Sequence, residues 1–460
     1  MSDIEAFVHD HFDDLLADLD AWLRIESISA SPDHAGEVRR SAEWLASRLR
    51  ALGFPTVEVW ETPGLPAVFA QWPSDDAEAT VVTLYGHHDV QPVDPIELWK
   101  TPPFVPTVIG DELFCRGAID DKGQVLFHLL GLKAHLETTG RPSPAVTLNL
   151  IVEGEEESGS VHFRQLLEDH RDRLACDVVV VSDTSIFDRD TPSICTGMRG
   201  MVDCQIDLHG PDVDLHSGSF GGAVPNPLAV MADLLAGLHD SDGRVTLEGF
   251  YDRVVDLSDR ERALFAKLPF DEDRWIRETA LSRGTKGEAG YTTLERVWAR
   301  PTAEINGMWG GYTGPGHKTI VPTDAHAKVS FRLVADQSNA EVIAAVKAYV
   351  AGWDRDGITA TVEFSGPGVR PCLTPLDSPA LRAATVAMEK AFGKEILYTR
   401  EGGSGPEADL ADVLAAPVLF VGVGLPDDRI HAPNERVVLS QLALGAQAAA
   451  HLWAELAQIT

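Results

Sequence analysis

The apolar positions from about Phe7 to Leu52 repeat at the spacing of α-helices, so two helices are predicted in this part of the chain. A further helix is predicted from Gly123 to Leu136, where Val125, Leu129 and Leu132 share one side. These helical stretches alternate with short apolar runs of a different kind.

Four short runs are continuously apolar or rich in β-branched residues, which is typical of strands buried on both faces. They are Ala79–Tyr85, Ala145–Val152, Asp177–Val181 and Pro417–Val423. Alternation of such strands with helices predicts a layered α/β domain with a mainly parallel sheet.

The middle of the chain, roughly Cys195 to Pro371, has a different pattern. Short alternating strands such as Met201–Leu208 and Ala327–Val334 are separated by Gly and Pro turns, which predicts an inserted α+β domain. The α/β pattern resumes with a helix from about Ser378 to Phe392. We therefore expect one discontinuous domain made of residues 1–194 and 375–460, and an inserted domain made of residues 195–374.

Composition and charge restrict the class of protein. The 460 residues are 44% hydrophobic and 24% charged, and they contain no apolar run of about 18 residues, so a globular protein without a membrane span is expected. The 38 Lys and Arg against 71 Asp and Glu give a net charge of -33, which repels nucleic acids and anionic membranes. The acidic start MSDIEAFVHDHFDDLL lacks the features of a secretory signal, and five scattered cysteines are a poor disulfide framework, so we expect a cytoplasmic protein.

Polar residues follow the first predicted strand directly, in Gly86–Asp89. The carboxyl ends of strands are where open α/β sheets place their ligands. In an extended segment His87 and Asp89 point to the same side, and His88 points to the other. We interpret His87 as a candidate metal ligand.

Two carboxylate clusters follow the same pattern. Asp120 and Asp121 open the predicted helix, where they either cap it or, with Asp120 as a bridge, hold two cations. Glu155, Glu156 and Glu157 follow the next strand, either as a solvated acidic loop or as a metal site. In such a site one carboxylate ligates and its neighbour acts as a base.

Asp183 and His431 complete the set, the latter eight residues beyond the end of the last predicted strand. Alone, Asp183 is typical of a turn and His431 of an ordinary surface or core histidine. Together, five clusters that offer His, Asp, Glu, Asp and His match a hydrolytic site with two metal ions and a shared carboxylate.

The motifs GHHDVQP, RGAIDDKG, EGEEESGS, VVVVSD, DLHSGSFGG, GHKTIVP, SFRLV, REGGSGP and HAPNE occur in this order along nearly the whole chain. In this the sequence resembles the co-catalytic metallopeptidases that include carnosine dipeptidases, glutamate carboxypeptidase, acetylornithine deacetylase and succinyl-diaminopimelate desuccinylase. DLHSGSFGG and REGGS are most similar to the carnosinase-like cytosolic dipeptidase branch. The resemblance implies a zinc-peptidase-like catalytic domain interrupted by a lid and dimerisation domain.

The resemblance also implies a ligand set. His87 and Asp183 would hold one divalent ion, Glu157 and His431 the other, and Asp120 would bridge the two. Zinc is the usual ion in the family, with manganese or cobalt as substitutes. The peptide bond after Asp120 is often cis in relatives.

Three further residues match family residues that act in catalysis. Glu156 matches the general base, and Asp89 matches the carboxylate that orients His87. His216 in DLHSG resembles the lid histidine that stabilises the oxyanion, often from the partner subunit.

Three lid and loop residues resemble contacts to the terminal carboxylate of the substrate: Arg332, Thr319 and Ser404. For Arg332 an ion pair on a strand face is the alternative from the residues alone. A further lid histidine of carnosinases has no counterpart near Ser365–Gly368, so the resemblance does not imply β-alanyl-histidine as the substrate.

We therefore expect a metal-dependent homodimeric hydrolase that cleaves dipeptides or short peptides with a free C-terminal carboxylate. An N-acyl-amino-acid deacylase or desuccinylase with the same metal centre is the alternative. A non-catalytic relative that only binds metal or peptide is disfavoured, because Glu156, Asp120 and both ligand histidines are present.

Overall fold

A computed structural model describes residues 2–459 of the chain, which divides into two compact units. The first unit comprises the chain up to Gly197, Leu373–Thr399 and the chain from Pro406 onwards, and the second comprises Met198–Cys372 and Arg400–Gly405. Three of the boundaries fall inside the short strands β8 (Ser193–Met198), β15 (Cys372–Leu373) and β16 (Leu397–Glu401). The segment Arg400–Gly405 groups with the second unit, although the sequence placed it within the stretch 375–460 of the other domain.

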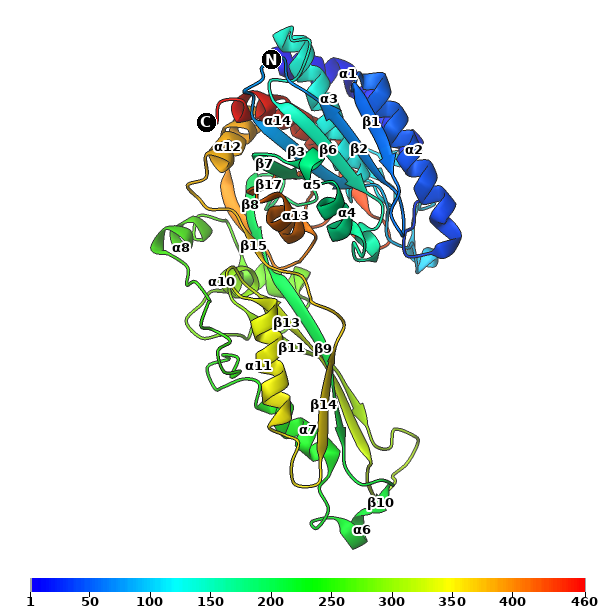
Figure 1. Cartoon of the computed structure of the whole chain (residues 1–460), viewed down its shortest axis with the longest axis vertical. Helices are drawn as coiled ribbons and strands as arrows, with labels where there is room; N and C mark the ends of the chain where they lie inside the picture. Colours follow the sequence, from blue (N-terminus) through cyan, green and yellow to red (C-terminus); the bar gives the residue numbers. More distant parts are fainter. Residues whose placement is uncertain (1, 460) are drawn as a thin grey trace. The chain divides into compact units, whose positions relative to one another are not determined.

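A six-stranded sheet of order β1-β2-β6-β3-β7-β17 forms the centre of the first unit (Figure 1). The strands are β1 (Thr56–Trp60), β2 (Ala67–Trp72), β3 (Val81–His87), β6 (Thr147–Glu153), β7 (Val178–Val181) and β17 (Val418–Phe420). β6, β3, β7 and β17 run parallel to one another, whereas β1 and β2 are added antiparallel at one edge. The predicted α/β fold with a mainly parallel sheet is confirmed, and the two edge strands are an addition to it.

Helices complete the first unit. They are α1 (Asp3–Leu23), α2 (Ala35–Leu52), α3 (Lys122–Thr139), α4 (Phe163–Asp169), α5 (Arg171–Leu174), α12 (Pro379–Phe392), α13 (Glu407–Leu414) and α14 (Leu439–Leu456), with short helical turns η1 (Pro32–His34), η2 (Ile96–Leu98) and η3 (Glu156–Ser158). α3 packs against α14 and α1, and most of its residues are buried. A Cβ added at Gly131 of α3 would lie 2.6 Å from the carbonyl oxygen of Ala446, so glycine allows the close approach of α3 to α14.

Parallel pairing brings the ends of three strands to one edge of the main sheet. His87 at the end of β3 pairs with Glu153 at the end of β6, and Tyr85 pairs with Val181 at the end of β7. The polar residues that follow these strands therefore lie near one another. The last strand, β17, ends at Phe420, so the predicted strand to Val423 was too long and His431 belongs to a longer loop.

A small sheet of order β18-β5-β4 attaches that loop to the rest of the first unit. Its strands are β4 (Thr107–Ile109), β5 (Glu112–Phe114) and β18 (Arg436–Val438). β18 pairs antiparallel with β5, with Arg436 opposite Phe114. The end of the His431 loop consequently lies beside the segment that leads to Asp120.

The second unit is built on an antiparallel sheet of order β11-β13-β9-β14, the α+β arrangement expected for the middle of the chain. Its elements are β9 (Gly200–His209), β10 (Leu215–His216), α6 (Ser217–Phe220), α7 (Pro227–Ala236), α8 (Asp259–Phe265), α9 (Glu272–Arg274), η4 (Trp275–Thr279), α10 (Thr293–Ala299), β11 (Thr302–Gly310), β12 (Ile320–Val321), β13 (Asp324–Leu333), α11 (Asn339–Ala351) and β14 (Thr359–Phe364). β9 and β13 alternate between buried and partly exposed residues because only one face packs against α7 and α11. Arg332 lies on the other, polar face. Among the described helices, none combines the length and the hydropathy needed to span a bilayer.

Candidate metal centre

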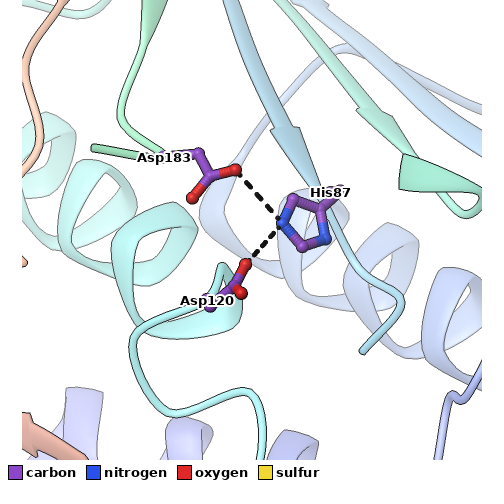
Figure 2. Close-up of side chains that lie close together, drawn as sticks. All are labelled: His87, Asp120 and Asp183. Atoms are coloured by element: carbon purple, nitrogen blue, oxygen red, sulfur yellow. Dashed lines mark hydrogen bonds and ion pairs between the residues drawn. The ribbon is translucent and has the colours of Figure 1, made fainter. Parts of the chain in front are cut away.

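The first group of candidate ligands comprises His87, Asp120 and Asp183 (Figure 2). The Nε2 atom of His87 lies 2.9 Å from Oδ1 of Asp120 and 3.5 Å from Oδ2 of Asp183. His87 ends β3, Asp183 follows β7, and Asp120 comes just before α3. His87 and Asp183 converge because β3 and β7 are parallel neighbours in the sheet.

The second group comprises Asp120, Glu157 and His431. The Nε2 atom of His431 lies 3.0 Å from Oδ2 of Asp120 and 3.0 Å from Oε2 of Glu157. The side chain of Glu157 is only 1% exposed, whereas that of His431 is 53% exposed. This group therefore contains the most exposed of the candidate ligands, since the side chain of Asp183 in the first group is 23% exposed.

Asp120 belongs to both groups and joins them. Its Oδ1 faces His87 and its Oδ2 faces His431, so each carboxylate oxygen serves a different group. The peptide bond between Asp120 and Asp121 is cis. Each group combines one histidine with carboxylates, and the two groups share one carboxylate. This arrangement is typical of a centre that holds two cations.

The donor set fits divalent metal ions. Each group offers one imidazole nitrogen and two carboxylate oxygens within 4.8 Å of one another, which suits zinc, manganese or cobalt. Oε1 of Glu157 is buried and has no hydrogen-bond partner among the described residues. So many carboxylates at one place repel one another unless cations neutralise them.

Neighbouring side chains support the ligands: Asp89 and Asp121 are buried, and Gln91 is partly buried. The carboxylate of Asp89 accepts a hydrogen bond from the backbone N–H of Glu157 (3.0 Å), and its other oxygen lies 3.4 Å from Nδ1 of His87. Asp121 accepts a hydrogen bond from the backbone N–H of His87 (3.2 Å), and the side-chain amide of Gln91 donates to Oε2 of Glu157 (2.8 Å). Asp89 thus contacts a ligand of each group. The sequence had singled out Asp89 but neither Gln91 nor a supporting role for Asp121.

Glu156 lies beside both groups without belonging to either. It begins the helical turn η3, directly before Glu157. Burial raises the pKa of the Glu156 carboxyl well above its ordinary value, and the carboxylates of Asp183 and Glu157 raise it further, although His87 opposes them. Burial also raises the pKa of Glu157, to about 7. Glu156 therefore has a higher affinity for a proton than an exposed carboxylate, as a general base near neutral pH requires.

The neighbouring histidine is turned away, as the alternation of an extended segment predicts. His88 is fully buried, and its Nε2 lies 2.9 Å from the carbonyl oxygen of Pro66. Burial lowers the pKa of His88 to about 4, so it is neutral at physiological pH. His88 therefore has a structural role in holding the segment before β2.

In the second unit the structure pairs Arg332 with Ser404. Nη1 of Arg332 donates to the Ser404 hydroxyl (2.8 Å), which in turn donates to the carbonyl oxygen of Arg199 (2.5 Å). Among the described residues, no carboxylate forms an ion pair with the guanidinium of Arg332. The structure therefore does not contain the strand-face ion pair that was the alternative for this residue. A half-buried guanidinium without a carboxylate partner is suited to bind an anion.

His216 and Thr319 form a separate pair in the second unit. Strand β10 pairs with β12, with His216 opposite Ile320, and the carbonyl oxygen of Thr319 accepts a hydrogen bond from Ser217 N–H (3.0 Å). Figure 1 shows β10 beyond the ends of the long strands β9 and β14. β13 begins at Asp324, close to the end of β12, and Arg332 lies near the other end of β13. The four lid and loop residues are therefore brought together as two pairs, not as one cluster.

Comparison with known proteins places the chain among peptidases. Residues 83–455 match the peptidase family M20/M25/M40. The chain is 30% identical to the Beta-Ala-His dipeptidase of Homo sapiens, over 98% of this chain and 91% of that protein. It is 28% identical to the Cys-Gly metallodipeptidase DUG1 of Saccharomyces cerevisiae, over 92% of this chain and 91% of that protein.

The solved structures agree with the sequence relatives. The dipeptidase Dug1p from Saccharomyces cerevisiae superposes with a TM-score of 0.80 at 25% identity, over 99% of this chain and 98% of that chain. The predicted resemblance to the metallopeptidases, and with it the prediction of a hydrolase, is confirmed. The chain belongs to the peptidase family M20/M25/M40.

Proposed function

We propose that this protein is a dipeptidase that uses two divalent metal ions and cleaves dipeptides or short peptides with a free C-terminal carboxylate. The observation that carries the proposal is the position of Asp120, whose two oxygens face His87 on one side and His431 on the other. His87 and Asp183 would hold one ion, Glu157 and His431 the other, with Asp120 between them. Zinc is the proposed metal, and manganese or cobalt would suit the same donors.

When bound, such ions polarise the scissile carbonyl and lower the pKa of a water molecule. The residues of the chain supply the proton transfers. The Glu156 carboxylate takes a proton from the attacking water and then delivers it to the leaving amine. Asp89 holds His87 and the backbone of Glu157 in place.

His216 would stabilise the oxyanion that forms on the substrate. Its Nδ1 accepts a hydrogen bond from the backbone N–H of Gly218 (3.1 Å). A backbone N–H only donates, so Nδ1 carries no proton and the neutral ring has its N–H at Nε2. Nε2 is thereby available as a donor to an oxyanion.

Arg332, with Ser404, would bind the terminal carboxylate of the substrate, since a guanidinium matches the planar geometry of a carboxylate. Thr319 would bind the same end of the substrate. Asp324 lies at the end of β13 near β12, the strand that pairs with the His216 strand β10. At the rise per residue of an antiparallel strand, Asp324 and Arg332 are about 27 Å apart, whereas a dipeptide spans only about 7 Å. We therefore propose a homodimer through the second unit, in which His216 and Thr319 act in the site of the partner subunit.

The five cysteines are scattered along the chain and are a poor disulfide framework, which favours a reducing compartment, and we propose the cytoplasm. The test of the reaction is a substrate screen by mass spectrometry on protein reloaded with zinc, manganese or cobalt. We expect turnover of Cys-Gly or β-Ala-His type dipeptides and little turnover of their C-terminal amides. Turnover confined to N-acetyl or N-succinyl amino acids would instead establish a deacylase.

A further inference from the structure

Glu435 is a buried carboxylate that contacts the loop carrying Asp120. Its side chain accepts hydrogen bonds from Nη1 of Arg116 (2.6 Å) and from the backbone N–H groups of Gly117 (3.0 Å), Ile119 (3.2 Å) and Asp120 (3.3 Å). Glu435 is 0% exposed. One carboxylate thus satisfies three backbone donors in the four residues that end at Asp120.

The backbone of Glu435 is fixed from the other side. Its carbonyl oxygen accepts a hydrogen bond from Cys115 N–H (3.1 Å), directly before the pairing of β18 with β5. The preceding residue, Asn434, accepts from the backbone N–H of Lys100 (2.7 Å) and donates to the carbonyl oxygen of Leu98 (2.9 Å). Glu435 therefore extends from an anchored position into the Asp120 loop.

Glu435 also belongs to the loop that carries His431, and His431 precedes Glu435 by four residues. That loop is closed by a hydrogen bond from Arg436 N–H to the carbonyl oxygen of Asp428 (3.0 Å). Glu435 consequently joins the backbones of two ligands of the second group, Asp120 and His431. In the first group only Asp120 depends on it, because His87 and Asp183 lie at the ends of strands of the main sheet.

We propose that Glu435 is a positioning residue that holds Asp120 and His431 in register, and that its loss selectively weakens the metal ion of the second group. This inference rests on the proposed two-ion centre. Residues that orient metal ligands from behind contribute about 10- to 100-fold to metal affinity. A residue with only a structural role would instead lower the stability of the fold and leave the affinities of both ions unchanged.

The test is equilibrium dialysis of Glu435→Gln against buffered zinc, with the bound metal counted by mass spectrometry. The amide has the size of the carboxylate, but its NH2 group would face a backbone N–H or Arg116, which are donors themselves. We expect the wild type to bind two ions, and the variant to keep one and bind the other about 10- to 100-fold more weakly. At limiting zinc its activity should fall, and excess zinc should restore it.

The matched control is Glu288→Gln in the second unit. Glu288 is also buried, and it pairs with Arg300 (2.8 Å) and Arg244 (2.9 Å). This variant loses a comparable buried ion pair, so it should unfold at a lower temperature while it binds both ions as the wild type does. If Glu435→Gln does not fold, Glu435→Asp, which keeps the charge but shortens the side chain, should show the same selective loss.

Two results would overturn the inference. A folded Glu435 variant that binds both ions with wild-type affinity would show that the residue has only a structural role. A variant that weakens both ions by the same factor would show that Glu435 does not act on the second group in particular. A wild-type protein that binds fewer than two ions would contradict the proposed function itself.

Discussion

Two variants that we expect to be inactive alone, His216→Ala and Glu156→Gln, should restore activity when they are mixed, because in the proposed homodimer each removes a different half of a shared site. In the second unit, the pair of His216 and Thr319 is remote from Arg332 and Ser404. The strand between Asp324 and Arg332 alone spans about 27 Å. A dipeptide of about 7 Å bound at Arg332 therefore cannot reach His216 of the same chain.

The size of the effect follows from counting the sites. Each parent homodimer lacks one essential residue in both sites, so each should be nearly inactive. In a mixed dimer one site has the intact Glu156 of one chain and the intact His216 of the other, while the second site lacks both. Random exchange at equal amounts makes about half of the dimers mixed, so activity should reach about one quarter of the wild type.

The assay is hydrolysis of a dipeptide after subunit exchange, with the fraction of mixed dimers measured by native mass spectrometry. His209→Ala is the control, because His209 is an exposed histidine of the same unit that pairs with Asp324, and this variant should remain active alone. If mixed dimers form but activity stays at the mean of the two parents, the proposed sharing of His216 is wrong. Full activity of His216→Ala alone would remove His216 from the mechanism.

Four further predictions concern single residues. Glu156→Gln should keep both ions but lower kcat about 10²- to 10⁴-fold, because an amide does not take up the proton; wild-type kcat in a metal-replete variant would exclude Glu156 as the base. Arg332→Ala should raise KM for dipeptides by about 10- to 150-fold, which corresponds to the loss of about 1.5 to 3 kcal/mol from a charged hydrogen bond. The same variant should hardly change the weak turnover of C-terminal amides. An equal effect on dipeptides and on their amides would contradict a contact between Arg332 and the substrate carboxylate. Gly131→Ala should lower the free energy of unfolding in urea by about 1 to 3 kcal/mol, because its Cβ would lie 2.6 Å from the carbonyl oxygen of Ala446; an unchanged midpoint would mean that the helices shift freely. The hydrogen bond between His209 and Asp324 raises the pKa of His209 and lowers the pKa of Asp324. The pair therefore stabilises the fold between about pH 4 and 6.5, and this stabilisation is lost as the pH rises through the pKa of His209. The melting temperatures of the wild type and His209→Ala should differ slightly at about pH 5.5 and agree at about pH 9.

The strands that carry the candidate ligands were predictable because they are buried on both faces. The continuous apolar runs before His87 and Asp183 correspond to β3 and β7, and in parallel neighbours the carboxyl ends meet at one edge. Strands β1 and β2 were missed. β1 is an edge strand whose first four residues are only partly buried, so its hydrophobic signal is weak.

The contact of Asp89 with His87 was expected from the motif that contains both residues, but the other contacts that support the ligands were not predictable from local patterns. Glu435 was visible in the motif HAPNE, but its partner Arg116 lies 319 residues earlier in the chain. Only the pairing of β18 with β5 brings the two together. Similarly, the separation of His216 from Arg332 depends on the position of β10 and β12 at one end of the second unit, which short motifs do not encode.

The most direct measurement is the location of bound metal by anomalous diffraction at the zinc edge, on crystals of the zinc-loaded protein. Two peaks are expected in each chain, one among His87, Asp120 and Asp183 and the other among Asp120, Glu157 and His431. A single peak, or zinc bound away from Asp120, would contradict the claim that this carboxylate joins two metal ions.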